Sequence, residues 1–315
     1  MCLHRVLPDA ERSFLPENRA LELTDAGLRE LLAWVRKRGL DAICLNEVSG
    51  RLERPGKRRF VVFTFDDGYR DNLTHALPIF REFGVPFAVN ITTGFISRSE
   101  PVWWYVIERV LAARQSAEFQ ACGEKWNFAW SVDVQGRDTM LQILARKIRA
   151  FGPAARNEFV QAMCAVADVD AKQVGEELIL SWNEAKKLAD DPLVTIGAHT
   201  VTHCQLSALT QEEVRRELAE SRRVLETELG RSVNHLAYPF GGKSAAGPRE
   251  YEIAKECGYG TAVTTCCANL FREHERHLCS LPRIGVGGGY PPVSRFRNME
   301  SGLIPAVENR LKRFP

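Results

Sequence analysis

Hydrophobic runs and amphipathic stretches alternate along most of the chain. Short runs rich in β-branched and aromatic residues are typical of buried strands, whereas apolar residues three or four positions apart are typical of helices. We expect strands at residues 41–45, 60–65, 85–91, 193–198, 233–238, 260–265 and 281–286. We expect helices at residues 24–38, 73–84, 210–229 and 248–257. Because strands separated by helices pair in parallel through right-handed crossovers, this order predicts an α/β fold.

One long stretch departs from this alternation. From residue 101 onward the sequence is helical in character, and we interpret residues 101–180 as a helical insertion. It interrupts a single domain that spans residues 1–315 and has its core at about 58–290. Ser181 and Thr210 each stand three residues before a glutamate, which is the capping-box signature of a helix start.

Composition places the chain among ordinary soluble globular proteins, with 45% hydrophobic and 26% charged residues in a length of 315. The net charge of +2 creates no basic field, so we expect no nucleic-acid partner. No run approaches the about 20 apolar residues that a transmembrane helix needs, and no protein partner is indicated. The first residues lack a charged-then-apolar signal region, so we expect a cytoplasmic protein unless the true start lies upstream.

Neither the cysteines nor the basic clusters define a site by themselves. The nine cysteines contain no C-x-x-C pair, which favours reduced thiols over a disulfide framework or a zinc ribbon. Basic residues gather within residues 51–59 and 310–313. We interpret both clusters as solvated loops, and the alternative is contact with an anionic or lipid-linked substrate.

Chemically unusual residues follow three of the expected strands. Asp66 and Asp67 follow the first, His199 and His203 follow the second, and Tyr238-Pro239-Phe240 ends the third. Reactive groups of parallel α/β folds collect where strands end, so we expect these side chains to lie close together.

One carboxylate and two histidines four residues apart form a plausible metal site. Each pattern alone is weak, because H-x-x-x-H occurs by chance and turns favour Asp for backbone reasons. Together, one Asp and two His make three ligands with an open position for water, as in catalytic rather than structural zinc sites. The second Asp would then be free to act as a base.

These segments carry a resemblance to a known family. Thr64-Phe65-Asp66-Asp67-Gly68 and His199-Thr200-Val201-Thr202-His203 resemble the first two motifs of the polysaccharide deacetylases, the NodB-homology or carbohydrate esterase 4 family. Ala237-Tyr238-Pro239-Phe240-Gly241 is similar to the third motif. The resemblance implies a distorted (β/α) barrel of about seven parallel strands, a divalent metal, and hydrolysis of an N-acyl group on a sugar.

The resemblance also implies roles for single residues. Asp67, His199 and His203 would be the metal ligands, and Asp66 the catalytic base that takes a proton from the attacking water. The metal would most often be Zn²⁺, which lowers the pKa of bound water to about 7, although Co²⁺ and Ni²⁺ also suit these ligands. The backbone N–H of Phe240 would stabilise the developing oxyanion.

Two departures from the family pattern leave roles open. Many members place an arginine two residues before the third-motif proline, where this chain has Ala237. Arg283, at the end of the last expected strand, is our candidate replacement partner for the catalytic Asp, and the alternative is a surface salt bridge.

The general acid is the second open role. The late L-x-x-x-H motif of the family has no clean copy, and His274 and His277 lie in a polar stretch. Cys2-Leu3-His4-Arg5-Val6 resembles the N-terminal Y-H-x-[VI] segment of relatives that deacetylate poly-N-acetylglucosamine. We therefore prefer His4 as the general acid over His274 and His277.

Four further residues are candidates for substrate contact: Tyr238, Pro239, Phe240 and Trp103. The first three alternatively form only a buried strand end, and Trp103 alternatively packs in the core of the insertion with its neighbour Trp104. An exposed aromatic face would stack on a sugar ring.

The sequence therefore predicts a metal-dependent hydrolase that removes N-acetyl groups from an N-acetylglucosamine-type glycan or glycan precursor. Three alternatives stay open. The first is an amidase or deformylase that uses the same site on another C–N bond. The second is a phosphohydrolase with a strand-end Asp nucleophile, although the D-x-D spacing of that class is absent. The third is a carbohydrate-binding relative without activity.

Overall fold

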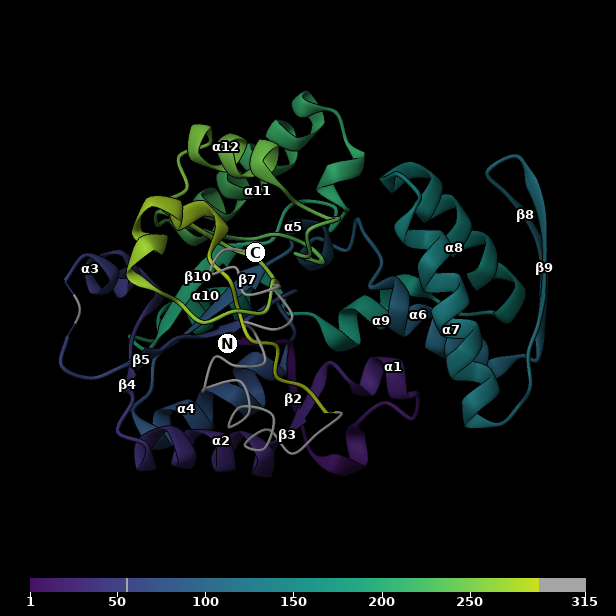
Figure 1. The fold of residues 1–315 in the computed structure, drawn as a ribbon. Coiled ribbons are helices and arrows are strands. Elements are labelled where there is room, and N and C mark those ends of the chain that lie inside the picture. The colour runs from purple at the N-terminus through teal and green to yellow at the C-terminus, as the bar shows by residue number, and fades with distance from the viewer. Residues whose placement is uncertain (55, 289–315) are drawn as a thin grey trace.

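Six parallel strands form the centre of the molecule, in a computed structural model that describes residues 1–54 and 56–288 (Figure 1). In sheet order these are β1 (Cys2–Leu3), β6 (Phe63–Phe65), β7 (Phe87–Ile91), β10 (Val194–Ala198), β11 (His235–Ala237) and β12 (Thr261–Val263). Their apolar residues are almost entirely buried, which explains the continuous hydrophobic runs in the sequence. The predicted α/β fold with parallel pairing is confirmed.

The expected strand at 281–286 is present only as two isolated bridges. Leu281 pairs with Val263 of β12, and Gly285 pairs with Cys2 of β1. The Cys2 N–H donates to the Ile284 carbonyl at 2.9 Å. The segment therefore lies between the two edges of a curled sheet of six strands, rather than forming one of about seven. Strand β1 was not predicted, because two residues are too short to show a pattern.

Helices cover the outside of the sheet, and two short strand pairs flank it (Figure 1). The helices are α1 (Pro16–Arg19), α2 (Asp25–Lys37), α3 (Val48–Glu53), α4 (Leu77–Phe83), α5 (Thr93–Ile96), α10 (Trp182–Ala189), α11 (Gln211–Leu229) and α12 (Pro248–Glu256). The short pairs are β2 (Arg5–Leu7) with β3 (Glu22–Thr24), and β4 (Asp41–Ala42) with β5 (Phe60–Val61). Short 3-10 or π turns occupy Asp9–Glu11, Leu45–Glu47, Asn72–Ala76, Leu206–Ala208 and Arg272–Ser280.

The predicted helix ends are confirmed. Ser181 and Thr210 each accept a hydrogen bond from the backbone N–H three residues on, and Glu184 and Glu213 complete both capping boxes. Gly230 ends α11 with φ 65°, a left-handed conformation that costs glycine little.

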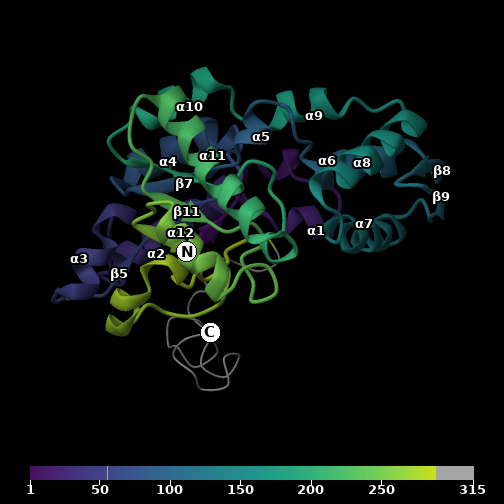
Figure 2. The same ribbon diagram turned by 90° about the horizontal axis from the view of Figure 1, so that it is seen from above.

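The insertion projects from the sheet as a separate group of elements in both views (Figures 1 and 2). It contains α6 (Trp103–Ala113), β8 (Ser116–Ala121), β9 (Glu124–Ala129), α7 (Val134–Arg149), α8 (Pro153–Ala167) and α9 (Ala171–Leu178). Besides its helices the insertion contains an antiparallel hairpin of β8 and β9, which was not predicted from the sequence. Cys122 and Gly123 turn this hairpin with φ values of 55° and 74°.

Aromatic side chains fill the space between α4 and the sheet. Phe80 of α4 stacks on Phe87 with ring centroids 4.3 Å apart and meets Phe63 edge-on at 5.4 Å. This packing fixes β6 and β7, whose ends carry the candidate site. Among the described residues no helix is long and apolar enough to cross a membrane. The basic cluster within 310–313 and the last two residues of the expected core lie outside the described part of the chain.

Candidate active site

The candidate residues meet at the edge of the sheet where the parallel strands end. Asp66 and Asp67 follow β6, His199 follows β10, and His203 lies four residues further along the same loop. All four side chains are buried, although they are polar. Burying such groups is costly unless they are paired or bind a cation, so their arrangement calls for an explanation by function.

Asp67, His199 and His203 form a group of potential metal ligands. The Asp67 Oδ1 atom lies 3.4 Å from His199 Nε2 and 3.3 Å from His203 Nε2. This Oδ1 is buried and accepts no hydrogen bond from the described residues. The three ligand atoms all lie within 4.8 Å of one another. Three N and O donors around a shared point suit a divalent cation such as Zn²⁺ with one open position.

Neighbouring groups orient the two histidine rings and act differently on their charge. His199 Nδ1 lies 2.7 Å from the Ala237 carbonyl, which can only accept, so Nδ1 carries a proton and Nε2 faces Asp67. Burial lowers the pKa of His203 to about 4. Burial also opposes charge on His199, but the Asp66 and Asp67 carboxylates and the hydrogen bond to the Ala237 carbonyl together outweigh it and raise the pKa of His199.

The loop that carries the histidines has an uncommon backbone. Thr200 and His203 adopt φ values of 64° and 51°, in the left-handed region that side chains other than glycine rarely occupy. Arg156 of α8, in the insertion, donates to the Thr202 carbonyl at 2.7 Å and to the His203 carbonyl at 3.3 Å. From the other side, Glu217 of α11 accepts from the backbone N–H of Val201 and Thr202, both at 2.9 Å. These contacts hold the strained loop.

Asp66 has a different set of partners. Arg283 binds it with both guanidinium arms, at 2.8 Å to Oδ1 and 2.7 Å to Oδ2. Asn90, in β7, donates to Oδ1 at 2.8 Å. Burial is the largest single influence and would raise the pKa of Asp66, but the charge and hydrogen bonds of Arg283, together with the nearby His199 and His4, outweigh it and hold that pKa below its usual range. Asp66 is therefore a buried anion at neutral pH, and Arg283 is buried beside it rather than at the surface.

His4 comes close to Asp66 from the N-terminal segment. A nitrogen of His4, the Cys2 thiol and a carboxylate oxygen of Asp66 lie within 4.8 Å of one another. Both oxygens of Asp66 already accept from Arg283, so this second group is a poorer cation site than the first. His274 is bonded within its own turn through Nδ1 and Phe271, and neither it nor His277 belongs to a ligand group found in the described chain.

The third strand end offers one residue to the site. Tyr238 is fully buried with its hydroxyl donating to the Cys279 carbonyl at 2.8 Å, and Pro239 is buried as well. Phe240 is half-buried, adopts φ 60°, and places its ring 5.0 Å from that of His203. Its backbone N–H makes no hydrogen bond to any described residue.

Trp103 is only 2% exposed, so its ring packs within the insertion and offers no free face to a sugar. Its neighbour Trp104 lies nearer the site. The Trp104 ring is 5.3 Å from that of His203, and its Nε1–H donates to the Tyr69 hydroxyl at 2.9 Å. The insertion therefore forms one wall behind the histidine loop.

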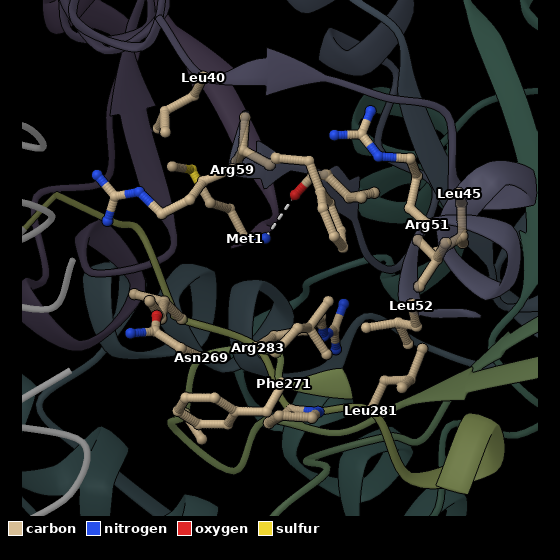
Figure 3. A pocket seen from close by; sticks show the side chains of 18 of the residues that line it. Met1, Leu40, Leu45, Arg51, Leu52, Arg59, Asn269, Phe271, Leu281 and Arg283 are labelled. Carbon is tan, nitrogen blue, oxygen red and sulfur yellow. Dashed lines mark hydrogen bonds between the residues drawn. The ribbon is translucent and has the colours of Figure 1, made fainter. Parts of the chain in front are cut away.

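A cavity of about 570 Å³ lies beside Met1 and Arg283 (Figure 3). Apolar side chains make most of its wall, including Leu45, Leu52 and Leu281, and Met1 and Arg283 lie between them. Arg51, from the basic cluster at its rim, pairs with Asp41 at 3.0 Å. The cavity contains none of the three candidate metal ligands, so it is separate from the proposed reaction site.

Sequence reasoning missed Asn90 and Arg156. Asn90 is the single polar residue in the apolar stretch 85–91, and a buried amide in such a strand was an available signal. Arg156 gave no signal, because it lies far from the histidine loop in sequence and reaches it only through the packing of the insertion.

Comparisons with known proteins agree with this geometry. The family model described as "Polysaccharide deacetylase" matches residues 53–131 and 149–262. These segments include Asp66, Asp67, His199 and His203, whereas His4 and Arg283 lie outside them.

Two curated proteins share shorter segments. The putative polysaccharide deacetylase YxkH of Bacillus subtilis is 26% identical over 116 residues, which is 37% of this chain and 40% of that protein. Poly-beta-1,6-N-acetyl-D-glucosamine N-deacetylase of Escherichia coli is 32% identical over 72 residues, or 22% of this chain and 11% of that protein. The matched segments thus span well under two thirds of these relatives.

Solved structures share the fold over most of the chain. The Streptococcus pyogenes deacetylase PplD in complex with acetate has a TM-score of 0.61 and 17% identity, covering 95% of this chain and 96% of that one. IcaB from Ammonifex degensii has a TM-score of 0.56 and 16% identity, and the match covers 95% of this chain and 94% of that one. The family model matches more than half of the sequence, and the chain belongs to the polysaccharide deacetylase family.

Proposed function

We propose that this protein is a metal-dependent hydrolase that removes N-acetyl groups from an amino sugar within a glycan or glycan precursor. One observation carries the proposal. A three-ligand group (Asp67, His199 and His203) lies beside a buried carboxylate, Asp66, that is anionic and has its own cationic partner. Family membership and the named activity of the Escherichia coli relative support the same reaction.

Asp67, His199 and His203 would hold the cation, with Zn²⁺ as our first choice and Co²⁺ or Ni²⁺ as alternatives. A cation bound there supplies Lewis-acid polarisation of the substrate carbonyl and lowers the pKa of water. Both histidines present Nε2 toward Asp67, and burial favours the neutral form of His203.

Asp66 would accept the proton of the attacking water. Arg283 and Asn90 hold its two oxygens in place, so the carboxylate needs no reorientation during the reaction. The unpaired N–H of Phe240 would donate to the oxygen that becomes negative when water adds to the amide carbonyl. His4 would then protonate the amine as the C–N bond breaks, which releases acetate and a free amino sugar.

The direct test measures metal content and acetate release from short N-acetylglucosamine oligomers. We compare the native protein with Asp66→Asn and His199→Ala. His199→Ala should lose the metal, Asp66→Asn should keep it, and both should lose at least about 100-fold in rate, the usual scale for a general base.

Matched controls remove the same residue types elsewhere. Asp190→Asn changes an exposed carboxylate paired with Arg231, and His75→Ala changes a histidine next to Asp25. Both should retain metal and activity. Metal binding without acetate release from any acetylated sugar would overturn the proposed reaction, and absence of metal from the native protein would overturn the site.

A further inference from the structure

A second cleft lies directly beside the candidate active site. It has a volume of about 550 Å³ and is lined by α7 of the insertion and by the loop that follows the histidines. Its polar lining residues are Glu17, Gln142, Arg146, Arg149 and Gln205. Gln205 comes two residues after His203, so one wall of the cleft continues the loop that carries the proposed metal ligands.

A single aromatic ring separates this cleft from His203. The guanidinium of Arg149 lies 5.5 Å from the centre of the Phe240 ring. The centre of the Phe240 ring also lies 5.0 Å from the centre of the His203 ring. A glycan whose N-acetyl group reaches the candidate metal ligands would therefore place an adjoining unit against Phe240 and Arg149.

The charges in the cleft are only partly compensated. Arg146 is exposed and makes no hydrogen bond or ion pair within the described chain. Arg149 has one acidic neighbour, Glu17, at 3.9 Å, and both side chains are close to half exposed. Such a pair is weak, because water screens it.

The two glutamine side chains have already used amide donors. Gln142 Nε2 donates to Asp138 at 2.9 Å, and Gln205 Nε2 donates to the Ser244 carbonyl at 2.8 Å. The arginines are therefore the strong donors that remain for a ligand. Guanidinium groups prefer carboxylate and phosphate oxygens, which they bind with two parallel hydrogen bonds.

We propose that Arg146 and Arg149 bind an anionic group, a carboxylate or a phosphate, carried by the glycan next to the N-acetylated sugar. The inference rests on the proposed function and narrows its substrate class to acidic glycans or phosphate-linked precursors. A neutral oligomer would occupy the same site without these contacts.

The experiment uses three probes that separate the two sources of charge. These are a neutral N-acetylglucosamine tetramer, a tetramer alternating N-acetylglucosamine with glucuronate, and UDP-N-acetylglucosamine. We measure kcat/KM for acetate release with the native protein, and equilibrium binding of the same probes to Asp66→Asn. At least one anionic probe should exceed the neutral tetramer in both measurements by about tenfold, and the advantage should fall as salt is added.

The variants assign that advantage to the cleft. Arg146→Gln combined with Arg149→Gln should remove the preference, so that kcat/KM for the anionic probe falls to the value that the same variant gives with the neutral tetramer. Arg216→Gln, on α11, deletes an exposed arginine with no hydrogen bond or ion pair to a described residue, and should change neither value.

Equal binding of charged and neutral probes, or a preference that survives the double variant, would overturn the inference. Arginine-dependent binding of an anionic probe without acetate release from any probe would instead support the cleft and reject the deacetylase reaction. The two failures are thus distinguishable.

Discussion

At the scale of single residues, the position of Asn90 depends on a glycine in the next strand. Asn90 and Gly197 are direct partners in the pairing of β7 with β10. A Cβ atom at position 197 would come far too close to Asn90 Oδ1. Because Gly197 has no side chain, the Asn90 amide has room to turn toward Asp66.

We predict that Gly197→Ala lowers acetate release by about tenfold, because the displaced Asn90 amide loses its hydrogen bond to the charged Asp66, worth about 1.5–3 kcal/mol. Metal content should stay unchanged. In an Asn90→Ala background, Gly197→Ala should lower acetate release little further, because the effects of two substitutions that act through the same hydrogen bond are not additive. Equal losses in both backgrounds would contradict the link between the two residues.

Arg283 gives a second prediction at this scale. Arg283→Met removes both hydrogen bonds to Asp66 and the charge that holds the pKa of that carboxyl down. We expect at least about a 100-fold loss of kcat with the metal retained, and a pH–rate profile whose acidic limb moves to higher pH. A profile that keeps its position would show that Arg283 has no influence on the base.

At the scale of elements, the insertion supports the histidine loop. Arg156 is buried, pairs with Glu100 at 2.5 Å and reaches two carbonyls of the loop. We predict that Arg156→Met weakens metal affinity by about 10- to 100-fold, as other losses of support around ligands do. Competition with a chelator measures the metal affinity of both proteins.

The matched control for this experiment is Arg114→Met, also in the insertion. Arg114 donates to the Val166 carbonyl and is exposed. Its loss should leave metal affinity unchanged. If both variants bind metal equally well, the insertion does not position the loop.

Most helices and strands could be predicted from the sequence, because the residues that mark their ends are close together along the chain. Capping boxes at Ser181 and Thr210 and the left-handed stop at Gly230 depend on neighbours a few residues away. The β8–β9 hairpin also had a local signal, since β8 alternates exposed and buried residues before the turn at Cys122 and Gly123. It was missed because helical segments surround it.

The candidate site was only partly visible for the opposite reason. Motif residues such as Asp66 and His199 stand at strand ends, where a parallel sheet brings reactive groups together. The contact of Arg283 with Asp66 was inferred as one of two alternatives. Arg156 and Asn90 act through tertiary packing and hydrogen bonds between strands, which no spacing along the chain encodes.

At the scale of the whole molecule, His235 should make the stability of the fold sensitive to acid. This buried histidine of β11 bonds Thr261 through Nδ1 at 2.7 Å, and burial lowers its pKa to about 4 from 6.5. Between these values the unfolded chain binds a proton that the folded chain does not. The contribution of His235 to the free energy of unfolding is therefore fully present above pH 6.5. It is lost as the pH falls toward 4, by about 3 kcal/mol in total.

His235→Gln tests this prediction. Urea unfolding at several pH values should show a shallower decline in the free energy of unfolding for the variant than for the native protein, although the variant is less stable at pH 7. Parallel curves for the two proteins would exclude His235 as a source of acid sensitivity.

Metal removal should also act on the whole molecule. A cation that binds only the folded state at 100 times its Kd adds about 2.7 kcal/mol to the free energy of unfolding. We predict that a chelator lowers the melting temperature of the native protein and leaves that of His199→Ala unchanged. Equal shifts in both proteins would place the stabilising cation elsewhere.

The pairing of Cys2 with Gly285 and of Asp66 with Arg283 has a consequence for how the protein is made. A ribosome completes the first member of each pair long before the second. Until residues 281–286 have been synthesised, the curled sheet stays open and Asp66 lacks its guanidinium. Contacts so distant in sequence fold slowly and leave apolar strand edges exposed meanwhile. Newly made chains should therefore depend on chaperones more than their final stability suggests.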